Sequence, residues 1–243
     1  MKEEKVKTEK SQKKEKPVSI TVKANKKGRH VMKLLSVLRV IVVPIYYLFK
    51  PFRYFGQRKV KDGACVYISN HYTLFDPVYI VSTTWEGVHF VCKKEVAEKP
   101  VLGGIARGVK TIFANRDGND IRTMLDCLKC LKNGEKVAIY PEGTRNRTEE
   151  EILPFKHGAA AMAIKTKTPI VPVVMYNKPK LFRCTHILIG SPFELSEYYD
   201  KKLSENDYVE ADEKLRQIML DMRHEHKEYL ENKEMNKKRN KKR

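Results

Sequence analysis

The chain has 243 residues, 41% of them hydrophobic, which is enough for one large domain with a buried core. Its formal net charge is +19, of which residues 1–30 carry +7 and residues 223–243 carry +5, so the tails and the body are all basic. Five cysteines, an odd number, behind a Lys/Glu-rich N-terminus predict reduced thiols in a cytosolic setting and argue against a secreted disulfide framework.

The N-terminal part divides into two segments. Residues 1–30 are polar and basic, and we expect a mostly disordered tail there. Residues 31–59 begin with nineteen mainly apolar residues, which Lys33, Arg39 and Pro44 interrupt, and continue with aromatic and basic side chains. This composition favours a helical segment that docks on a membrane, lying at its interface or half inserted. A buried core helix and a transmembrane span are the alternatives.

Residues 60–222 alternate short apolar runs with helical patterns, which predicts an α/β domain with a largely parallel β-sheet flanked by helices. Strands are expected at 65–69, 88–92, 110–114, 136–140, 170–176 and 185–189. Helices are expected at 77–85, 95–107, 119–132, 157–167 and 206–232. Residues 223–243 are expected to form a basic C-terminal tail that continues from the last helix.

One cysteine pair needs an interpretation, because Cys127 and Cys130 form a C-x-x-C. No second pair completes a zinc framework, and the apolar residues around the two cysteines have helical spacing. We therefore interpret them as thiols on the flank of a helix and predict no metal site.

Three polar clusters each follow a predicted strand. Asn70, His71 and Asp76 follow the first strand, residues 115–117 follow the strand at 110–114, and residues 141–147 follow the strand at 136–140. Ligands of open α/β sheets bind outside the carboxyl ends of strands, where such loops converge. The pattern predicts one cleft lined by a histidine, a glutamate and arginines.

His71 and Asp76 have the chemistry of an oriented base. Histidine takes up a proton near neutral pH, and a neighbouring carboxylate fixes its tautomer and stabilises the imidazolium. No nucleophile accompanies the pair, so it suggests a base that activates a hydroxyl of the substrate. Each signal also has a plain structural explanation: Asp76 before Pro77 is a good helix cap, His71 could be a loop histidine, residues 141–144 an ordinary turn, and the arginines surface charges.

Taken together, the clusters resemble a known family. Asn70-His71-x4-Asp76, Phe113-x-x-Arg116, Pro141-Glu142-Gly143-Thr144-Arg145 and Val171-Pro172-Val173 stand in the order of the four blocks of the glycerolipid acyltransferases. The resemblance extends over about residues 34 to 195 and is closest to the bacterial 1-acyl-sn-glycerol-3-phosphate acyltransferases. Two residues depart from the family pattern: Thr73 replaces a common serine, and Asn115 replaces an aspartate.

The resemblance implies a function for residues 60–222 as a catalytic domain. It implies transfer of a fatty acyl group from an acyl thioester to the sn-2 hydroxyl of lysophosphatidic acid, with His71 as the general base, Asp76 orienting it and Glu142 in the catalytic site. Arg116 and Arg145, with Lys93 as a third cation, are the expected phosphate ligands, and Gly143 and Thr144 belong to the same substrate-binding loop. The donor would be acyl-CoA or acyl carrier protein, without a cofactor or metal.

The expected setting is the cytoplasmic face of the cell membrane, because a lysophospholipid and a long acyl chain reside at a bilayer and anionic headgroups attract the basic residues. Other acceptors, glycerol 3-phosphate or a different lysophospholipid, remain open. A non-enzymatic basic protein that binds nucleic acid or a membrane is the alternative of another class, although no specific nucleic-acid signature is present. The chain also lacks the Lys-Ser/Thr that ends a phosphate-binding loop and the G-x-S-x-G of serine hydrolases.

Overall fold

The computed structural model describes residues 28–57, 62–114, 121–156 and 158–241, with side chains from Arg39 onward. Nearly all of the basic tail expected over residues 1–30 lies outside the described residues. Arg116, with the rest of the polar cluster at 115–117, lies outside them as well.

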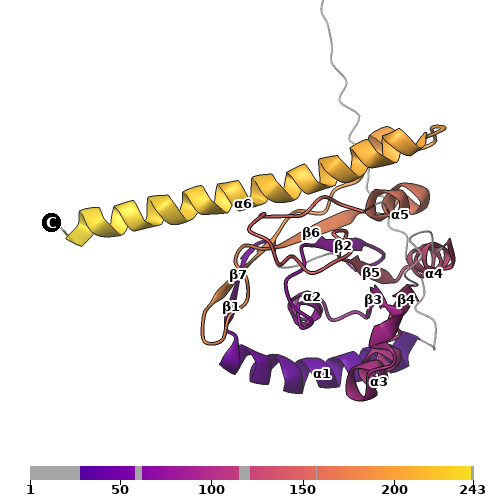
Figure 1. Cartoon of the computed structure of the whole chain (residues 1–243), viewed down its shortest axis with the longest axis horizontal. Helices are drawn as coiled ribbons and strands as arrows, with labels where there is room; N and C mark the ends of the chain where they lie inside the picture. The colour runs from indigo at the N-terminus through magenta and orange to yellow at the C-terminus, as the bar shows by residue number, and fades with distance from the viewer. Residues whose placement is uncertain (1–27, 58–61, 115–120, 157, 242–243) are drawn as a thin grey trace, which may run out of the picture.

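A seven-stranded sheet forms the centre of the molecule, with strand order β1-β7-β6-β2-β5-β3-β4 (Figure 1). Neighbouring strands run parallel except β6 and β7, which are antiparallel. The strands are β1 (Phe52–Gly56), β2 (Val66–Ser69), β3 (Val88–Lys93), β4 (Ile112–Ala114), β5 (Lys136–Ile139), β6 (Ile170–Met175) and β7 (Thr185–Ile189). This confirms the predicted α/β class and largely parallel sheet.

Helices cover both faces of the sheet, with α1, α2 and α3 on one side and α4, α5 and α6 on the other (Figure 1). The α-helices are α1 (Gly28–Phe49), α2 (Pro77–Val81), α3 (Pro100–Gly108), α4 (Ile121–Lys132), α5 (Ala159–Thr166) and α6 (Glu205–Lys241). Short 3₁₀ turns lie at Lys94–Val96 and Ser196–Tyr198.

Two hydrophobic cores result, because successive side chains of a strand point to opposite faces. Val66 and Ile68 of β2 pack with residues of α4, α5 and α6, whereas Cys65 and Tyr67 pack with residues of α1 and α2. All four are nearly or fully buried. The central strands are therefore apolar on both faces, as is typical of parallel sheets.

Helix α1 packs on the sheet domain with only part of its surface. Arg39 is buried and donates from Nε to the backbone oxygen of Val81, 2.9 Å away, at the end of α2. Tyr46 meets Tyr79 of α2 through their hydroxyls, 3.1 Å apart. Val43 is partly buried against the core, but the other large apolar side chains of the described part of α1 are exposed, so this part is not the buried core helix of the alternative interpretation.

The prediction of a helical segment over 31–59 is wrong at its C-terminal end. It stops at Phe49, and Phe52–Gly56 form the edge strand β1, which pairs in parallel with β7. Three aromatic rings in this stretch suggested a membrane interface, but Pro51 ends the helix and Phe52 packs in the core beside Tyr79, with ring centroids 5.3 Å apart. Among the described residues, no helix combines the length and the apolar character needed to cross a membrane.

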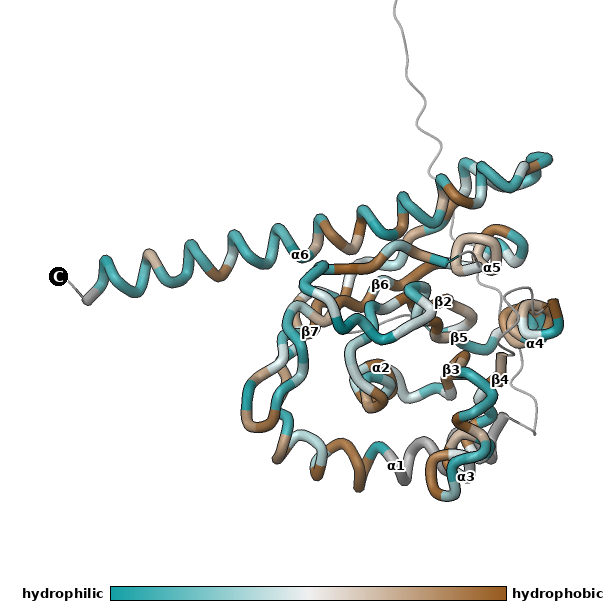
Figure 2. The backbone as a smooth tube through the Cα atoms, in the orientation of Figure 1, coloured by the Kyte–Doolittle hydropathy of each residue, from teal (hydrophilic) through white to brown (hydrophobic). Residues whose placement is uncertain are grey.

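The last helix is longer than predicted. Helix α6 runs on from the expected end at 232 to Lys241, so its final turns include most of the basic C-terminal tail. Its first half buries Ala211, Leu215 and Met219 against the sheet, His226 further on still packs on Phe55 of β1, and the last turns extend beyond the domain (Figures 1 and 2). Figure 2 shows mostly hydrophilic residues along that extension.

Candidate active site

The loops after β2 and β5 lie side by side, because these two strands are parallel neighbours in the middle of the sheet. His71 stands two residues after the end of β2, and Tyr140 directly follows β5. Both strands are short and almost entirely buried, so they hold the two loops at fixed positions. The structure therefore brings two of the three predicted polar clusters together at the carboxyl edge of the sheet.

Asn70 fixes the start of the first loop. Its side-chain Nδ2 donates to the backbone oxygen of Met175 at 3.0 Å, and its Oδ1 accepts from the backbone N–H of Met175 at 2.8 Å. The amide thus replaces one rung of the β2–β6 ladder after the strand has ended. Asn70 is fully buried, so both bonds form away from water, where leaving them unmade would be costly.

His71 and Asp76 form the predicted pair. His71 Nδ1 lies 2.8 Å from Asp76 Oδ2, and the carboxylate is buried. The same Oδ2 accepts from the backbone N–H groups of Tyr72 and Thr73 at 2.7 and 2.8 Å, and Oδ1 accepts from the Thr73 hydroxyl at 2.6 Å. Thr73 therefore supplies the hydroxyl of the serine that it replaces in the family pattern. Because the carboxylate accepts at Nδ1, that nitrogen carries the proton and Nε2 has the free lone pair.

Asp76 does not cap helix α2 with its side chain. It occupies the N-cap position but makes no side-chain cap hydrogen bond, because the hydrogen bonds of its carboxylate are made within the loop before the helix. The expectation that Asp76 caps the helix is thus wrong, while Pro77 begins the helix as predicted. The side chain is committed to the loop and to His71.

Glu142 and Asn146 hold the backbone of His71 from the second loop. Glu142 Oε1 accepts from the His71 N–H at 2.7 Å, and Asn146 N–H donates to the His71 oxygen at 2.6 Å. Glu142 Oε2 also accepts from the backbone N–H of Leu153 at 3.1 Å. Both polar groups of the His71 backbone are thus bound to the loop after β5, which determines where the imidazole stands.

Glu142 is a buried carboxyl group, only 1% exposed. Loss of hydration on burial raises its pKa to about 7, although the two backbone N–H groups act in the opposite direction. Gly143 beside it has φ +62°, and a Cβ there would come within 2.7 Å of the Lys156 side chain. Glycine therefore permits this turn, as expected, and its missing side chain leaves room for Lys156 to pack there.

The ring of Tyr140 packs against the imidazole ring of His71. The two rings stack with centroids 4.2 Å apart and planes 22° from parallel. The Tyr140 hydroxyl is buried without a hydrogen-bond partner among the described residues, and burial raises its pKa well above the usual value. The sequence argument did not single out this tyrosine, whose only signal is its place directly before the Pro141-Glu142-Gly143 turn.

The predicted cations remain at the surface. Arg145 and Thr144 are exposed on the loop after β5, and Lys93 is exposed at the carboxyl end of β3, the next strand of the sheet. Arg116 follows β4, outside the described residues. The structure therefore places Lys93 at the end of β3 and Arg145 in the loop after the neighbouring strand β5, both exposed to solvent.

Chemically, this arrangement can remove a proton from a bound hydroxyl. Within the described part of the chain, Nε2 of His71 has no hydrogen-bond partner, and the ring is partly exposed to solvent. Asp76 can stabilise the imidazolium that forms, and surface cations at the same sheet edge suit an anionic substrate.

Comparison with known proteins gives a consistent result. The family model described as Acyltransferase matches residues 52–176. A 1-acyl-sn-glycerol-3-phosphate acyltransferase of Helicobacter pylori is 34% identical over 122 residues, 49% of this chain and 52% of that protein. The human 1-acyl-sn-glycerol-3-phosphate acyltransferase beta is 31% identical over 156 residues, 57% of this chain and 56% of that protein.

A solved structure has the same fold. The crystal structure of the 1-acyl-sn-glycerophosphate acyltransferase PlsC from Thermotoga maritima aligns with a TM-score of 0.57 and 22% identity, over 77% of this chain and 75% of that one. The chain spans between about a third and a little over half of the length of the curated relatives, from 34% for a chloroplastic protein of Arabidopsis thaliana to 56% for the human one.

Proposed function

The chain belongs to the acyltransferase family, and we propose that it transfers a fatty acyl group from an acyl thioester to the sn-2 hydroxyl of 1-acyl-sn-glycerol 3-phosphate, giving phosphatidic acid. One observation carries the proposal: the buried Asp76 carboxylate occupies Nδ1 of His71 and leaves Nε2 to a substrate. Both relatives described above are named 1-acyl-sn-glycerol-3-phosphate acyltransferases, which supports this acceptor. Coenzyme A or acyl carrier protein carries the acyl group, and the chemistry uses no further cofactor.

In the proposed mechanism, His71 Nε2 takes the proton of the acceptor hydroxyl as its oxygen attacks the thioester carbonyl. The tetrahedral intermediate then collapses, the carbon–sulfur bond breaks, and the imidazolium gives the proton to the leaving thiolate, which becomes the free thiol. Asp76 keeps the tautomer and stabilises the imidazolium through both steps. Glu142 acts indirectly, because both of its oxygens are bound to the backbone N–H groups of His71 and Leu153. General-base catalysis of this kind contributes roughly 10²–10⁴-fold in rate.

The acceptor phosphate is proposed to bind Arg145, with Lys93 and Arg116 as further cations. A guanidinium binds phosphate oxygens in a bidentate manner, and an exposed side chain at the sheet edge can reach a soluble headgroup. Thr144 and Gly143 belong to the loop that carries Arg145. These contacts favour an acceptor that carries a phosphate, so we expect a neutral alcohol to be a poor substrate.

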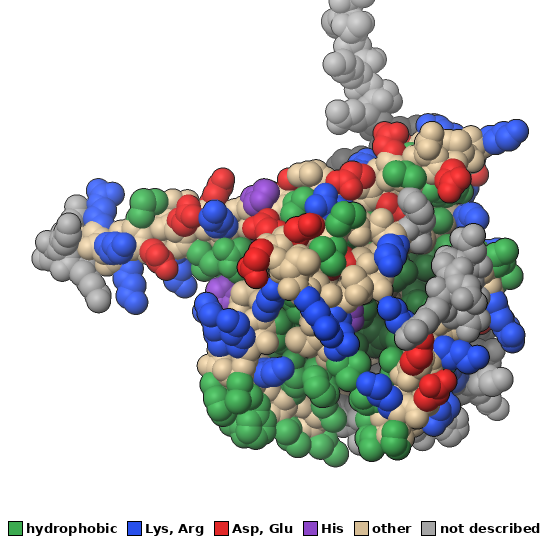
Figure 3. Space-filling model, viewed as in Figure 1, with side chains coloured by type: hydrophobic (Ala, Val, Ile, Leu, Met, Phe, Trp, Pro, Cys, Tyr) green, Lys and Arg blue, Asp and Glu red, His purple; other side chains and the backbone are tan. Residues whose placement is uncertain are grey.

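The domain is proposed to dock on the cytoplasmic face of the cell membrane. Large exposed hydrophobic side chains of α1 and of the β6–β7 connection form what we call the docking face: Val40, Ile41, Ile45, Leu48, Phe49, Leu181 and Phe182. Phe182 donates its backbone N–H to the Phe49 oxygen at 2.7 Å, which joins the two segments. Figure 3 shows hydrophobic side chains at the lower edge of the molecule with Lys and Arg above them.

A vesicle flotation experiment tests the docking. Liposomes that contain anionic lipid should carry the full chain, and Leu48→Asp with Phe182→Asp should lower the bound fraction, whereas Val209→Asp, an exposed apolar residue on α6, should not. Equal flotation of all three proteins would contradict a docking face on α1 and the β6–β7 connection.

An acyl-transfer assay on the purified full chain tests the function. Thiol release and mass spectrometry of the lipid product would compare lysophosphatidic acid with glycerol 3-phosphate and lysophosphatidylcholine, each with acyl-CoA and acyl carrier protein as donor. We expect phosphatidic acid from the first acceptor at the highest kcat/KM. Preference for another acceptor would overturn the acceptor assignment, and no transfer with any pair would overturn the function.

A further inference from the structure

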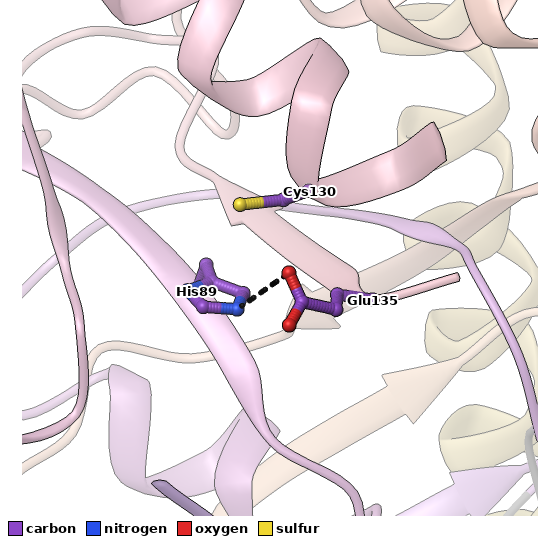
Figure 4. Close-up of side chains that lie close together, drawn as sticks. All are labelled: His89, Cys130 and Glu135. Atoms are coloured by element: carbon purple, nitrogen blue, oxygen red, sulfur yellow. Dashed lines mark ion pairs between the residues drawn. The ribbon is translucent and has the colours of Figure 1, made fainter. Parts of the chain in front are cut away.

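Three metal-binding side chains converge at the end of the sheet opposite the His71 loops. His89 is the second residue of β3, Glu135 directly precedes β5, and Cys130 lies in the last turn of α4. Their nitrogen, sulfur and oxygen atoms all lie within 4.8 Å of one another. In Figure 4 the imidazole of His89 faces the carboxylate of Glu135, and the sulfur of Cys130 lies beside the gap between them. The loops of the proposed active site follow the carboxyl ends of the strands, so this cluster plays no part in that chemistry.

The second nitrogen of His89 is already oriented. Nδ1 lies 3.0 Å from the backbone oxygen of Lys110, to which it can only donate. Metal-binding histidines characteristically donate their other N–H to a backbone oxygen or a carboxylate, which directs the remaining lone pair at the metal. Here the remaining lone pair belongs to Nε2, which faces Glu135, and the ring is buried.

The spacing of the ligand atoms suits a shared ion better than a direct bond. His89 Nε2 lies 3.4 Å from Glu135 Oε2. A charge-assisted N–H···O bond would be about 2.7–2.9 Å. Two ligand atoms, each about 2.0–2.1 Å from a tetrahedral zinc ion, lie about 3.3–3.4 Å apart. The nitrogen and oxygen are thus already at the separation that zinc needs.

The backbone holds Cys130 and Glu135 in a fixed relation. After α4 the chain turns at Gly134, with φ +79°, and the Glu135 N–H donates to the Cys130 oxygen at 3.0 Å. His89 is fixed across the sheet, since it pairs with Val137 in the β3–β5 ladder. The three ligands therefore stand on rigid elements and need only side-chain movements to bind an ion.

We propose that His89, Cys130 and Glu135 bind one zinc ion, with solvent as the fourth ligand. A nitrogen, a sulfur and a carboxylate oxygen are the ligand types that zinc takes in tetrahedral sites. The ion ties the end of α4 to β3 and β5 and acts as a structural clamp. The C-x-x-C that the sequence displays contributes one ligand only, because Cys127 is buried in the core with residues of α5 and α6.

Isothermal titration of the full chain with zinc chloride, after chelator treatment, tests the site. We expect one ion per chain, and loss of one ligand in Cys130→Ser or Glu135→Gln should weaken binding by more than about 100-fold, beyond what second-shell changes cost. Glu135 is partly exposed, so Glu135→Gln should fold, which circular dichroism would verify. Cobalt(II) should give a thiolate charge-transfer band in the wild type and not in Cys130→Ser.

Two control variants distinguish this cluster from other binders in the chain. Cys184→Ser removes an exposed thiol, and His186→Gln breaks the pair formed by His186 Nδ1 and His226 Nε2, 2.9 Å apart. Both should bind zinc as the wild type does. The proposal is overturned if the wild type binds no zinc, if Glu135→Gln and Cys130→Ser bind unchanged, or if His186→Gln loses the ion. None of these outcomes depends on the acyltransferase function.

Discussion

Replacing Asp76 with asparagine separates the charge of this side chain from its orienting role. An amide has one oxygen and one NH₂ group, so it can be seated in two ways. At the Oδ2 position three donors converge, from His71 Nδ1 and the backbones of Tyr72 and Thr73. An NH₂ group there would face two backbone N–H groups that cannot change their role. The asparagine oxygen must therefore occupy this position, and the NH₂ group falls beside the Thr73 hydroxyl, which can accept as well as donate.

The expected loss follows from this seating. His71 keeps its tautomer, because an oxygen still accepts from Nδ1, and only the charge is lost. A hydrogen bond to a charged group contributes about 1.5–3 kcal/mol and a neutral one about 0.5–1.5 kcal/mol. A difference of about 1–2 kcal/mol predicts a 5- to 30-fold fall in kcat, since each 1.4 kcal/mol is a factor of ten. In a serine protease triad, by contrast, the same exchange turns the histidine into the wrong tautomer and costs about 10⁴-fold.

Steady-state thiol release with lysophosphatidic acid and acyl-CoA measures the effect, with thermal unfolding to verify that Asp76→Asn is folded. An unchanged kcat would show that the carboxylate does not assist His71. A loss of about 10⁴-fold or more, the size seen when the tautomer is wrong, would refute the donor arrangement described above.

Three further predictions concern neighbouring residues. Burial raises the pKa of Glu142 to about 7 from 4.5, so its contribution to stability is present below pH 4.5 and is lost as the pH rises through 7. Between about pH 5 and pH 8, urea titrations should show that the free energy of unfolding falls by up to about 3 kcal/mol more in the wild type than in Glu142→Gln. An equal change of this free energy with pH in the two proteins would contradict the prediction. Tyr140→Phe keeps the ring that stacks on His71 and removes a buried hydroxyl that has no hydrogen-bond partner among the described residues, so urea unfolding should show about 1 kcal/mol higher stability at unchanged kcat; a clear loss of kcat would mean that the hydroxyl takes part in the chemistry. Arg145→Ala should raise KM for lysophosphatidic acid about tenfold, and not KM for the donor, whereas the exposed neighbour Arg147→Ala should leave both unchanged; equal effects of the two variants would refute a phosphate contact at Arg145.

The sequence predicted the inner strands because they are buried on both faces and form continuous apolar runs. Val66–Ser69 and Ile170–Met175 are such runs, and their positions agree with the prediction to within a residue. Strand β1 lacks this signal, since Phe52–Gly56 lies at the edge of the sheet with Arg53 exposed. Its pairing with β7, more than a hundred residues later, determines that it is a strand, and no local pattern contains that information.

The sequence identified residues of the candidate site, but not the hydrogen bonds that join them to distant parts of the chain. The His71–Asp76 pair is local, so the spacing of five residues was enough to find it. The bonds from Asn70 to Met175 and from Glu142 to the His71 backbone join residues 105 and 71 positions apart. They exist because β2, β5 and β6 are neighbours in the sheet, a fact of topology that an isolated sequence motif does not show.

The most direct test of the proposed mechanism is the kcat of His71→Ala with lysophosphatidic acid and saturating acyl donor. Among the described residues, the imidazole forms a hydrogen bond with Asp76 alone, while the backbone bonds to Glu142 and Asn146 persist in the variant, so the loop should keep its structure. We predict a fall of about 10²–10⁴-fold in kcat, with thermal stability and KM close to those of the wild type. Turnover at the wild-type rate would contradict a general base at His71.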